Sequence, residues 1–250
     1  RILNMILQTP KFKGYKFSNK PDLKAHAEVT RQSATEGMVL LKNEKGTLPL
    51  KADVKNIALF GCTSYDLIAG GTGSGNVNRA YTVSLLDGLK NAGYSLNNDL
   101  KRSYETYISE QNKINADKNK DKGAMAQFLP LPRAEEMSIA PKQLKELAEN
   151  SDVALITLGR MSGEFLDRTP SDFNLKNRES QLINSVSDAF HKVGKKVIVV
   201  LNIGGVIETS SWKEIPDAIL CAWQAGQEGG NSVADVIRGK SCPSGKLTMT

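Results

Sequence analysis

One loop of this sequence places the carboxylate of Glu164 between two arginines, directly after an apolar segment. The apolar segment, residues 153–159, predicts a buried strand. In open α/β sheets the loops that leave the carboxyl ends of strands form the ligand crevice, so a glutamate presented there is a candidate for general acid or base catalysis. Charged loops at strand ends are also common on solvated surfaces without function, and the pattern alone leaves that alternative open.

A second candidate is the glycine-rich loop of residues 69–77, which follows the first predicted strand. Gly71 and Gly73 fit the first two positions of the dinucleotide-binding pattern GxGxxG, but Asn76 occupies the third. No Gly-Lys-Ser or Gly-Lys-Thr sequence follows, as a phosphate-binding loop requires. Glycine also lets backbone approach any ligand or neighbouring segment closely. A loop of close approach at a domain edge is therefore favoured over a nucleotide site.

The sequence holds few of the residues that metal sites, disulfide frameworks or catalytic triads require. The 3 widely spaced cysteines exclude a complete disulfide framework, and with 2 histidines neither a zinc site nor a Ser-His-Asp triad is favoured, so no metal or other cofactor is predicted. The net charge of +6 comes partly from Lys101–Lys122, which lacks aromatic residues interleaved with base-reading arginines and predicts a solvated face rather than a nucleic-acid site. No apolar run approaches the roughly 18 residues of a membrane span.

The elements that must position these loops alternate between strands and helices. Apolar runs without alternation predict strands covered on both faces, and helical spacing of apolar residues predicts the helices between them. The succession predicts an α/β fold: a three-layer αβα sandwich around a mostly parallel sheet of about six strands, with room for one antiparallel edge strand. The predicted strands are 56–61, 94–97, 153–159, 196–204, 218–225 and 245–250, and the predicted helices are 22–43, 82–92, 141–150, 177–193 and 230–238, with a helix and then irregular chain over 101–137.

Five motifs in chain order carry a resemblance to a known family. The Glu164 loop reads Gly-Arg-x-Ser-Gly-Glu-x-x-Asp-Arg. The others are residues 36–43 with Leu48-Pro49-Leu50, the glycine-rich loop, residues 222–230, and Pro243-Ser244-Gly245-Lys246-Leu247. Over about residues 22–250 the chain resembles the C-terminal α/β domain of glycoside hydrolase family 3, the β-glucosidase-like enzymes. One departure is Phe165, where this type of loop commonly has glycine.

The resemblance implies an exo-acting retaining β-glycosidase of the β-glucosidase or β-xylosidase type, with Glu164 as general acid/base. It implies an aspartate nucleophile in a preceding (β/α)8 barrel, so residues 1–21 are expected to be the tail of that barrel and a linker. The domain, residues 22–250, is expected to continue past Thr250, and the chain alone is expected to be inactive. The expected partners are an oligosaccharide or glycoside and that barrel, and the full-length enzyme is expected to be periplasmic or secreted.

Substrate contacts are expected from the same two loops. The candidates are Arg160, Asp167, Arg168, Gly73 and Ser74. For Arg168, a salt bridge with Asp167 or Asp172 that holds the loop is favoured over a substrate contact. Arginines close to Glu164 would favour its ionised form, which predicts a poorly tuned acid in the isolated chain. An alternative function of another class is a non-catalytic carbohydrate-binding or interdomain module, in which Glu164 makes only polar contacts.

Overall fold

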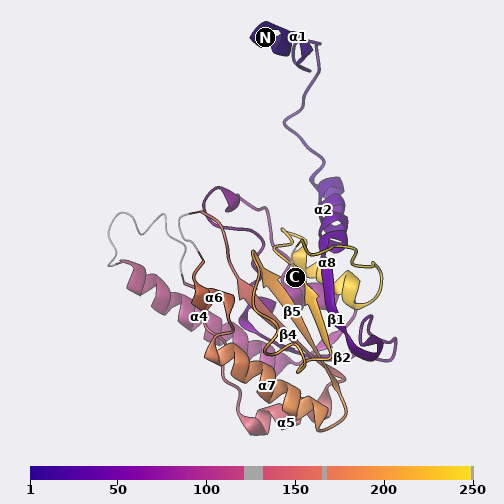
Figure 1. Ribbon diagram of the computed structural model, residues 1–250, viewed down its shortest axis with the longest axis vertical. Coiled ribbons are helices and arrows are strands. Elements are labelled where there is room, and N and C mark those ends of the chain that lie inside the picture. Colours follow the sequence, from indigo (N-terminus) through magenta and orange to yellow (C-terminus); the bar gives the residue numbers. More distant parts are fainter. Residues whose placement is uncertain (121–131, 165–167, 249–250) are drawn as a thin grey trace.

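A six-stranded sheet lies between two layers of helices in the computed structural model, which describes residues 1–120, 132–164 and 168–248 (Figure 1). The strand order is β1-β6-β5-β4-β2-β3; β1 runs antiparallel to β6, and the other neighbours are parallel. The predicted αβα sandwich with one antiparallel edge strand is therefore confirmed. The strands are β1 Val39–Asn43, β2 Asn56–Phe60, β3 Ser95–Leu96, β4 Val153–Arg160, β5 Lys196–Ile203 and β6 Ala218–Cys221. The α-helices are α1 Ile2–Gln8, α2 Leu23–Gly37, α3 Leu85–Asn91, α4 Asn98–Lys120, α5 Pro141–Asn150, α6 Pro170–Phe173, α7 Asn177–His191 and α8 Gly229–Ile237, and the 3-10 helices are Glu44–Gly46, Cys62–Ser64 and Gly73–Gly75.

The central strands are apolar on both faces because helices cover both faces of the sheet. Alternate residues of β4, such as Ile156, pack with α7 residues including Phe190 in one core. The intervening residues, such as Leu155, pack with α3 and α8 residues including Leu85 in the other. Burial on both faces removes the alternation of polar and apolar residues that a half-exposed strand would show.

The helix predicted over residues 22–43 is wrong in its second half. Helix α2 ends at Gly37, and Val39–Asn43 forms β1, which pairs with β6 in a register that places Leu40 opposite Leu220. A short apolar run such as Met38–Leu41 fits either a helix or a strand by periodicity. The segment forms a strand because the edge of β6 is otherwise unpaired, and pairing there satisfies the backbone hydrogen bonds of both segments.

The strand predicted over residues 245–250 is also wrong in the described part, because residues 245–248 form no strand. The Gly245 N–H instead donates to the Met38 carbonyl over 3.0 Å, so this segment passes across the junction between α2 and β1. Strand β6 ends earlier than predicted, before Trp223, whose φ of 54° is incompatible with a continuing strand.

Helix α1 lies apart from the sheet at the end of an extended segment that leads into α2 (Figure 1). Every residue of α1 is exposed, including the apolar ones. Among the described residues, no helix has the length and hydropathy that crossing a membrane requires.

Candidate functional site

The side chain of Glu164 is presented at the carboxyl end of β4 and held by the glycine-rich loop. Strand β4 ends at Arg160, and Glu164 follows in the next loop, fully exposed. Its Oε2 accepts the Ser74 backbone N–H over 3.0 Å, and the Ser74 hydroxyl donates to Oε1 over 2.8 Å and lies 3.0 Å from Oε2. The carboxylate therefore has a defined orientation although it lies at the surface.

The two loops approach each other so closely that glycine is required in both. The Thr72 N–H donates to the Ser162 carbonyl over 3.1 Å, and the Thr72 hydroxyl donates to the Glu164 carbonyl over 2.8 Å. A Cβ at Gly71 would lie 2.6 Å from the Ser162 oxygen, and one at Gly163 would lie 2.3 Å from the Thr72 nitrogen. The close approach expected of the glycine-rich loop is thus made to the loop that carries Glu164.

Ser74 also favours the ionised form of Glu164. Its N–H, and then its hydroxyl, hold the pKa of the Glu164 carboxyl below the ordinary value, because both bonds favour the charged form. The sequence attributed such an effect to Arg160 and Arg168, but both arginines pair with other carboxylates.

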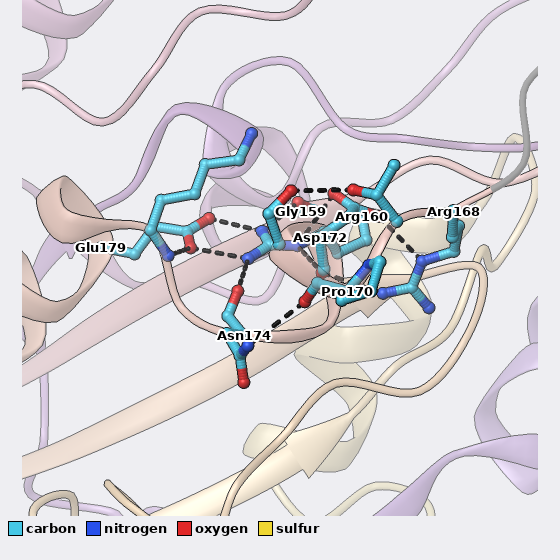
Figure 2. Close-up of polar contacts among 10 residues, drawn as sticks. Gly159, Arg160, Arg168, Pro170, Asp172, Asn174 and Glu179 are labelled. Carbon is cyan, nitrogen blue, oxygen red and sulfur yellow. Dashed lines mark hydrogen bonds and ion pairs between the residues drawn. The ribbon is translucent and has the colours of Figure 1, made fainter.

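The side chain of Arg160 is buried beneath this loop, and all five of its N–H groups are used by protein acceptors (Figure 2). Two of them bind the Glu179 carboxylate of α7. The other three donate to the carbonyls of Gly159, Asp172 and Asn174 over 2.8, 2.8 and 3.0 Å. The structure therefore places Arg160 in the framework that ties β4 to α6 and α7, with no N–H left for a substrate.

Arg168 anchors the C-terminal end of the same loop to α6. Its Nε donates to Asp172 Oδ2 over 2.8 Å and its Nη2 donates to the Asp172 carbonyl over 3.0 Å (Figure 2). The salt bridge to Asp172 that the sequence favoured is confirmed. Asp167, the other predicted partner and a predicted substrate contact, lies outside the described residues, as does Phe165.

Two buried carboxyl groups near the end of β4 were not singled out from the sequence. Glu179 and Glu136 are 5% and 6% exposed, and Glu136 Oε2 accepts the Cys62 backbone N–H over 2.9 Å. Burial raises the pKa of Glu136 to about 7. An arginine at the end of a buried strand signals that a carboxylate partner is needed, but the sequence holds 27 acidic residues and does not say which one.

A phosphate site at the next helix is not supported by the structure. Helix α3 begins at Leu85, and the Ser84 hydroxyl caps it by accepting the Asp87 N–H over 3.1 Å. Gly230 of α8 packs so closely on this terminus that a Cβ there would lie 1.9 Å from the Ser84 oxygen. The helix N-terminus that a nucleotide phosphate would need is therefore covered.

Comparison with known proteins places these features in a family. The sequence profile of the glycosyl hydrolase family 3 C-terminal domain matches residues 38–250. Beta-glucosidase A of Butyrivibrio fibrisolvens is 32% identical over 253 residues, which cover 90% of this chain and 28% of that enzyme. A periplasmic beta-glucosidase of Salmonella typhimurium is 31% identical over 235 residues, which also cover 90% of this chain and 28% of that protein.

Solved structures agree. The chain superposes on beta-glucosidase 3B from Thermotoga neapolitana, solved in complex with alpha-D-glucose, with a TM-score of 0.87 and 43% identity, over 98% of this chain and 33% of that one. The chain thus spans less than a third of the length of the Butyrivibrio relative. The match over residues 38–250 shows that the chain belongs to glycosyl hydrolase family 3 and corresponds to the C-terminal domain of that family.

Proposed function

We propose that this chain supplies the general acid/base, Glu164, to an exo-acting retaining β-glycosidase of the β-glucosidase or β-xylosidase type. The observation that carries the proposal is the position of Glu164: an exposed carboxylate at the carboxyl end of β4, oriented by Ser74. Membership of a glycosyl hydrolase family supports the reaction class. No cofactor is required by this chemistry.

Retaining hydrolysis needs two carboxyl groups roughly 5 Å apart. One attacks the anomeric carbon; the other donates a proton to the departing oxygen and then takes one from the attacking water. Glu164 fills the second role in this proposal. The nucleophile is an aspartate of a preceding (β/α)8 barrel, with residues 1–21 as the tail of that barrel and a linker. The exposed apolar side chains of α1, such as Ile2 and Leu3, support an interface there, and the chain alone is inactive.

The remaining predicted site residues divide by what they contact. Arg160 and Arg168 position the Glu164 loop through buried and half-buried ion pairs. Ser74 acts on Glu164 directly, and Gly73 makes room for it, since a Cβ there would lie 2.3 Å from Glu164 Oε2. Asp167 remains a candidate for contact with substrate. A periplasmic or secreted location for the full-length enzyme is supported by the Salmonella relative.

The test replaces Glu164 by Gln and by Ala in the full-length enzyme. For a β-glucoside with a poor leaving group, we expect kcat/KM to fall by about 10²–10⁴, the contribution typical of general acid–base catalysis. An aryl glucoside with a good leaving group needs less protonation and should lose less in its first step. With Glu164→Ala, added azide should restore turnover and yield a β-glycosyl azide, because the small anion replaces the water that the missing base would activate.

Glu208→Gln is the matched control, because this carboxylate is partly exposed and also held by serine hydroxyls, those of Ser210 and Ser211. The control should keep wild-type turnover and form no azide product. Unchanged turnover in Glu164→Gln, with no azide product from Glu164→Ala, would instead favour the non-catalytic carbohydrate-binding or interdomain module. In that alternative Glu164 serves only to hydrogen-bond to Ser74.

A further inference from the structure

A buried amide, that of Asn202, interrupts the apolar run of β5 near its carboxyl end. Its residue is 1% exposed, and it follows Ile198 and Val200 on the face of β5 that packs against α3 and α8. A buried amide is destabilising unless its polar atoms are hydrogen-bonded, whereas an aliphatic side chain would fill this place without that requirement. The contacts of Asn202 therefore have to account for a polar residue here.

The Asn202 amide joins two loops at the carboxyl edge of the sheet. Its Oδ1 accepts the Ile68 N–H over 2.7 Å, and its Nδ2 donates to the Ile68 carbonyl over 2.9 Å. The same Nδ2 donates its second hydrogen to the Trp223 carbonyl over 2.8 Å. The amide thus fixes both main-chain groups of Ile68 and connects them to the loop that follows β6, where Trp223 has its left-handed backbone conformation.

Ile68 leads directly into the glycine-rich loop, residues 69–77, and lies six residues before Ser74. The next residue is held in the same way, because the Ala69 carbonyl accepts the Gly226 N–H over 2.9 Å. The start of the glycine-rich loop is therefore fixed between the end of β5 and the loop after β6, and the part that follows carries Ser74.

The end of β5 also holds the loop that carries Glu164. Two residues past Asn202, the Gly204 carbonyl accepts the Ser162 hydroxyl over 2.8 Å. One strand end is therefore the common support of both loops: Asn202 bonds to the loop that carries Ser74, and Gly204 bonds to the loop that carries Glu164. The distance between Ser74 and Glu164 depends on how this strand end holds each loop.

We propose that Asn202 is a positioning residue for the acid/base: by fixing the start of the glycine-rich loop, it places the two Ser74 donors against the Glu164 carboxylate. The inference rests on the proposed function of Glu164. Asn202 acts through Ser74, whose N–H and hydroxyl lie 3.0 and 2.8 Å from the carboxylate oxygens. Without these bonds the exposed carboxyl has no fixed orientation toward the departing oxygen, and general acid catalysis depends on that orientation.

The test replaces Asn202 by Leu in the full-length enzyme, because leucine keeps the branched shape of asparagine and removes its donor and acceptor. The assay compares cellobiose with dinitrophenyl β-glucoside, whose departing group needs no proton. Displacing a reacting group by about 1 Å can cost about a hundredfold in rate, so we expect Asn202→Leu to lower kcat/KM for cellobiose by about 10–100-fold. The dinitrophenyl substrate should keep its kcat/KM within about twofold of wild type.

Asn43→Leu is the matched control. The Asn43 amide makes the same pair of bonds to the main chain of one residue, Leu48, over 2.8 Å each. Asn43 pairs with Ala218 at the start of β6, so it lies at the opposite edge of the sheet from Glu164. This variant should keep the wild-type kcat/KM on both substrates.

An NMR titration of the Glu164 carboxyl in the 250-residue chain tests the placement without turnover. The Ser74 bonds hold the Glu164 pKa below its ordinary value, so Asn202→Leu should raise that pKa and Asn43→Leu should leave it unchanged. In a Ser74→Ala background, Asn202→Leu should raise the pKa by less than it does in wild type, because one of the two donors it positions is already absent.

An unchanged Glu164 pKa in Asn202→Leu, or equal losses of kcat/KM on the two substrates, overturns the inference and leaves Asn202 a role in stability alone. If Asn202→Leu does not fold, Asn202→Asp takes its place, since it keeps an acceptor for the Ile68 N–H, with Asn43→Asp as control and the same deciding results. If Glu164→Gln leaves turnover unchanged, the proposed function fails, and the titration still decides whether Asn202 holds Ser74 against Glu164.

Discussion

Glu136 allows the packing at the end of β4 to be tested through the pH dependence of stability. Its carboxyl faces the Arg160–Glu179 ion pair and accepts the Cys62 N–H over 2.9 Å. Burial is the largest influence on its pKa and raises it to about 7; the Glu179 carboxylate also raises it, and the Cys62 N–H and Arg160 lower it. The other titratable groups beside it, the Cys62 thiol and the Tyr104 hydroxyl, have pKa values raised by burial and stay neutral up to pH 8.

The sign of the effect follows from proton binding. A carboxyl whose pKa is higher in the folded chain binds more protons when folded, so the free energy of unfolding falls as the pH rises between the unfolded and folded pKa values. With values of 4.5 and about 7, that loss is fully developed above pH 7 and amounts to about 3 kcal/mol. Glu136→Gln keeps an oxygen for the Cys62 N–H but cannot ionise. Its stability relative to wild type should therefore rise by about 2.5 kcal/mol between pH 5 and pH 8.

The assay is urea unfolding of the 250-residue chain at pH 5, 6, 7 and 8, followed by the fluorescence of Trp212 and Trp223. With a urea m value of about 2–3 kcal/mol/M, the midpoint difference between variant and wild type should widen by about 1 M over that range. Glu135→Gln is the control, because this neighbour's side chain is 65% exposed. A midpoint difference that stays constant with pH for Glu136→Gln would refute the reasoning, since the buried carboxyl would then titrate alike in both states.

Two further predictions concern the loop framework and the acid/base. Glu179→Ala leaves the buried Arg160 with only the Asp172 carboxylate, whose Oδ1 lies 3.4 Å from its Nε, and should lower the free energy of unfolding by about 3 kcal/mol in urea titrations. Glu105→Ala, which removes a surface pair with Lys101, should cost less than about 1 kcal/mol, and similar losses for both would contradict the framework role. Ser74→Ala removes the hydroxyl donor and keeps the backbone N–H, so it should raise the Glu164 pKa only in part and move the alkaline limb of kcat/KM to higher pH in the full-length enzyme. Ser74→Thr should restore the wild-type profile, and an unmoved limb in Ser74→Ala would show that the Ser74 hydroxyl does not tune Glu164.

Local patterns were sufficient for most of the sheet and for the position of the candidate acid/base. Residues 153–160 form β4, and the parallel pairing of β4 with β2 and β5 follows from uninterrupted apolar runs separated by helices. The strand at 39–43 could not be separated from the end of a helix, because five residues are too few for periodicity to discriminate.

The sequence by itself determined the αβα architecture, the loop that carries Glu164 and the family to which its motifs belong, because each depends on short-range patterns of apolar residues, glycine and charge. Only the tertiary structure decided which groups hydrogen-bond to these carboxylates. Ser74 and Glu164 lie 90 residues apart, and Cys62 and Glu136 lie 74 apart. Which donor meets which carboxylate depends on how parallel strands bring distant loops to one edge of the sheet, and no local spacing encodes that. The loop at Glu164 is therefore a carboxylate held by a serine over a buried ion pair.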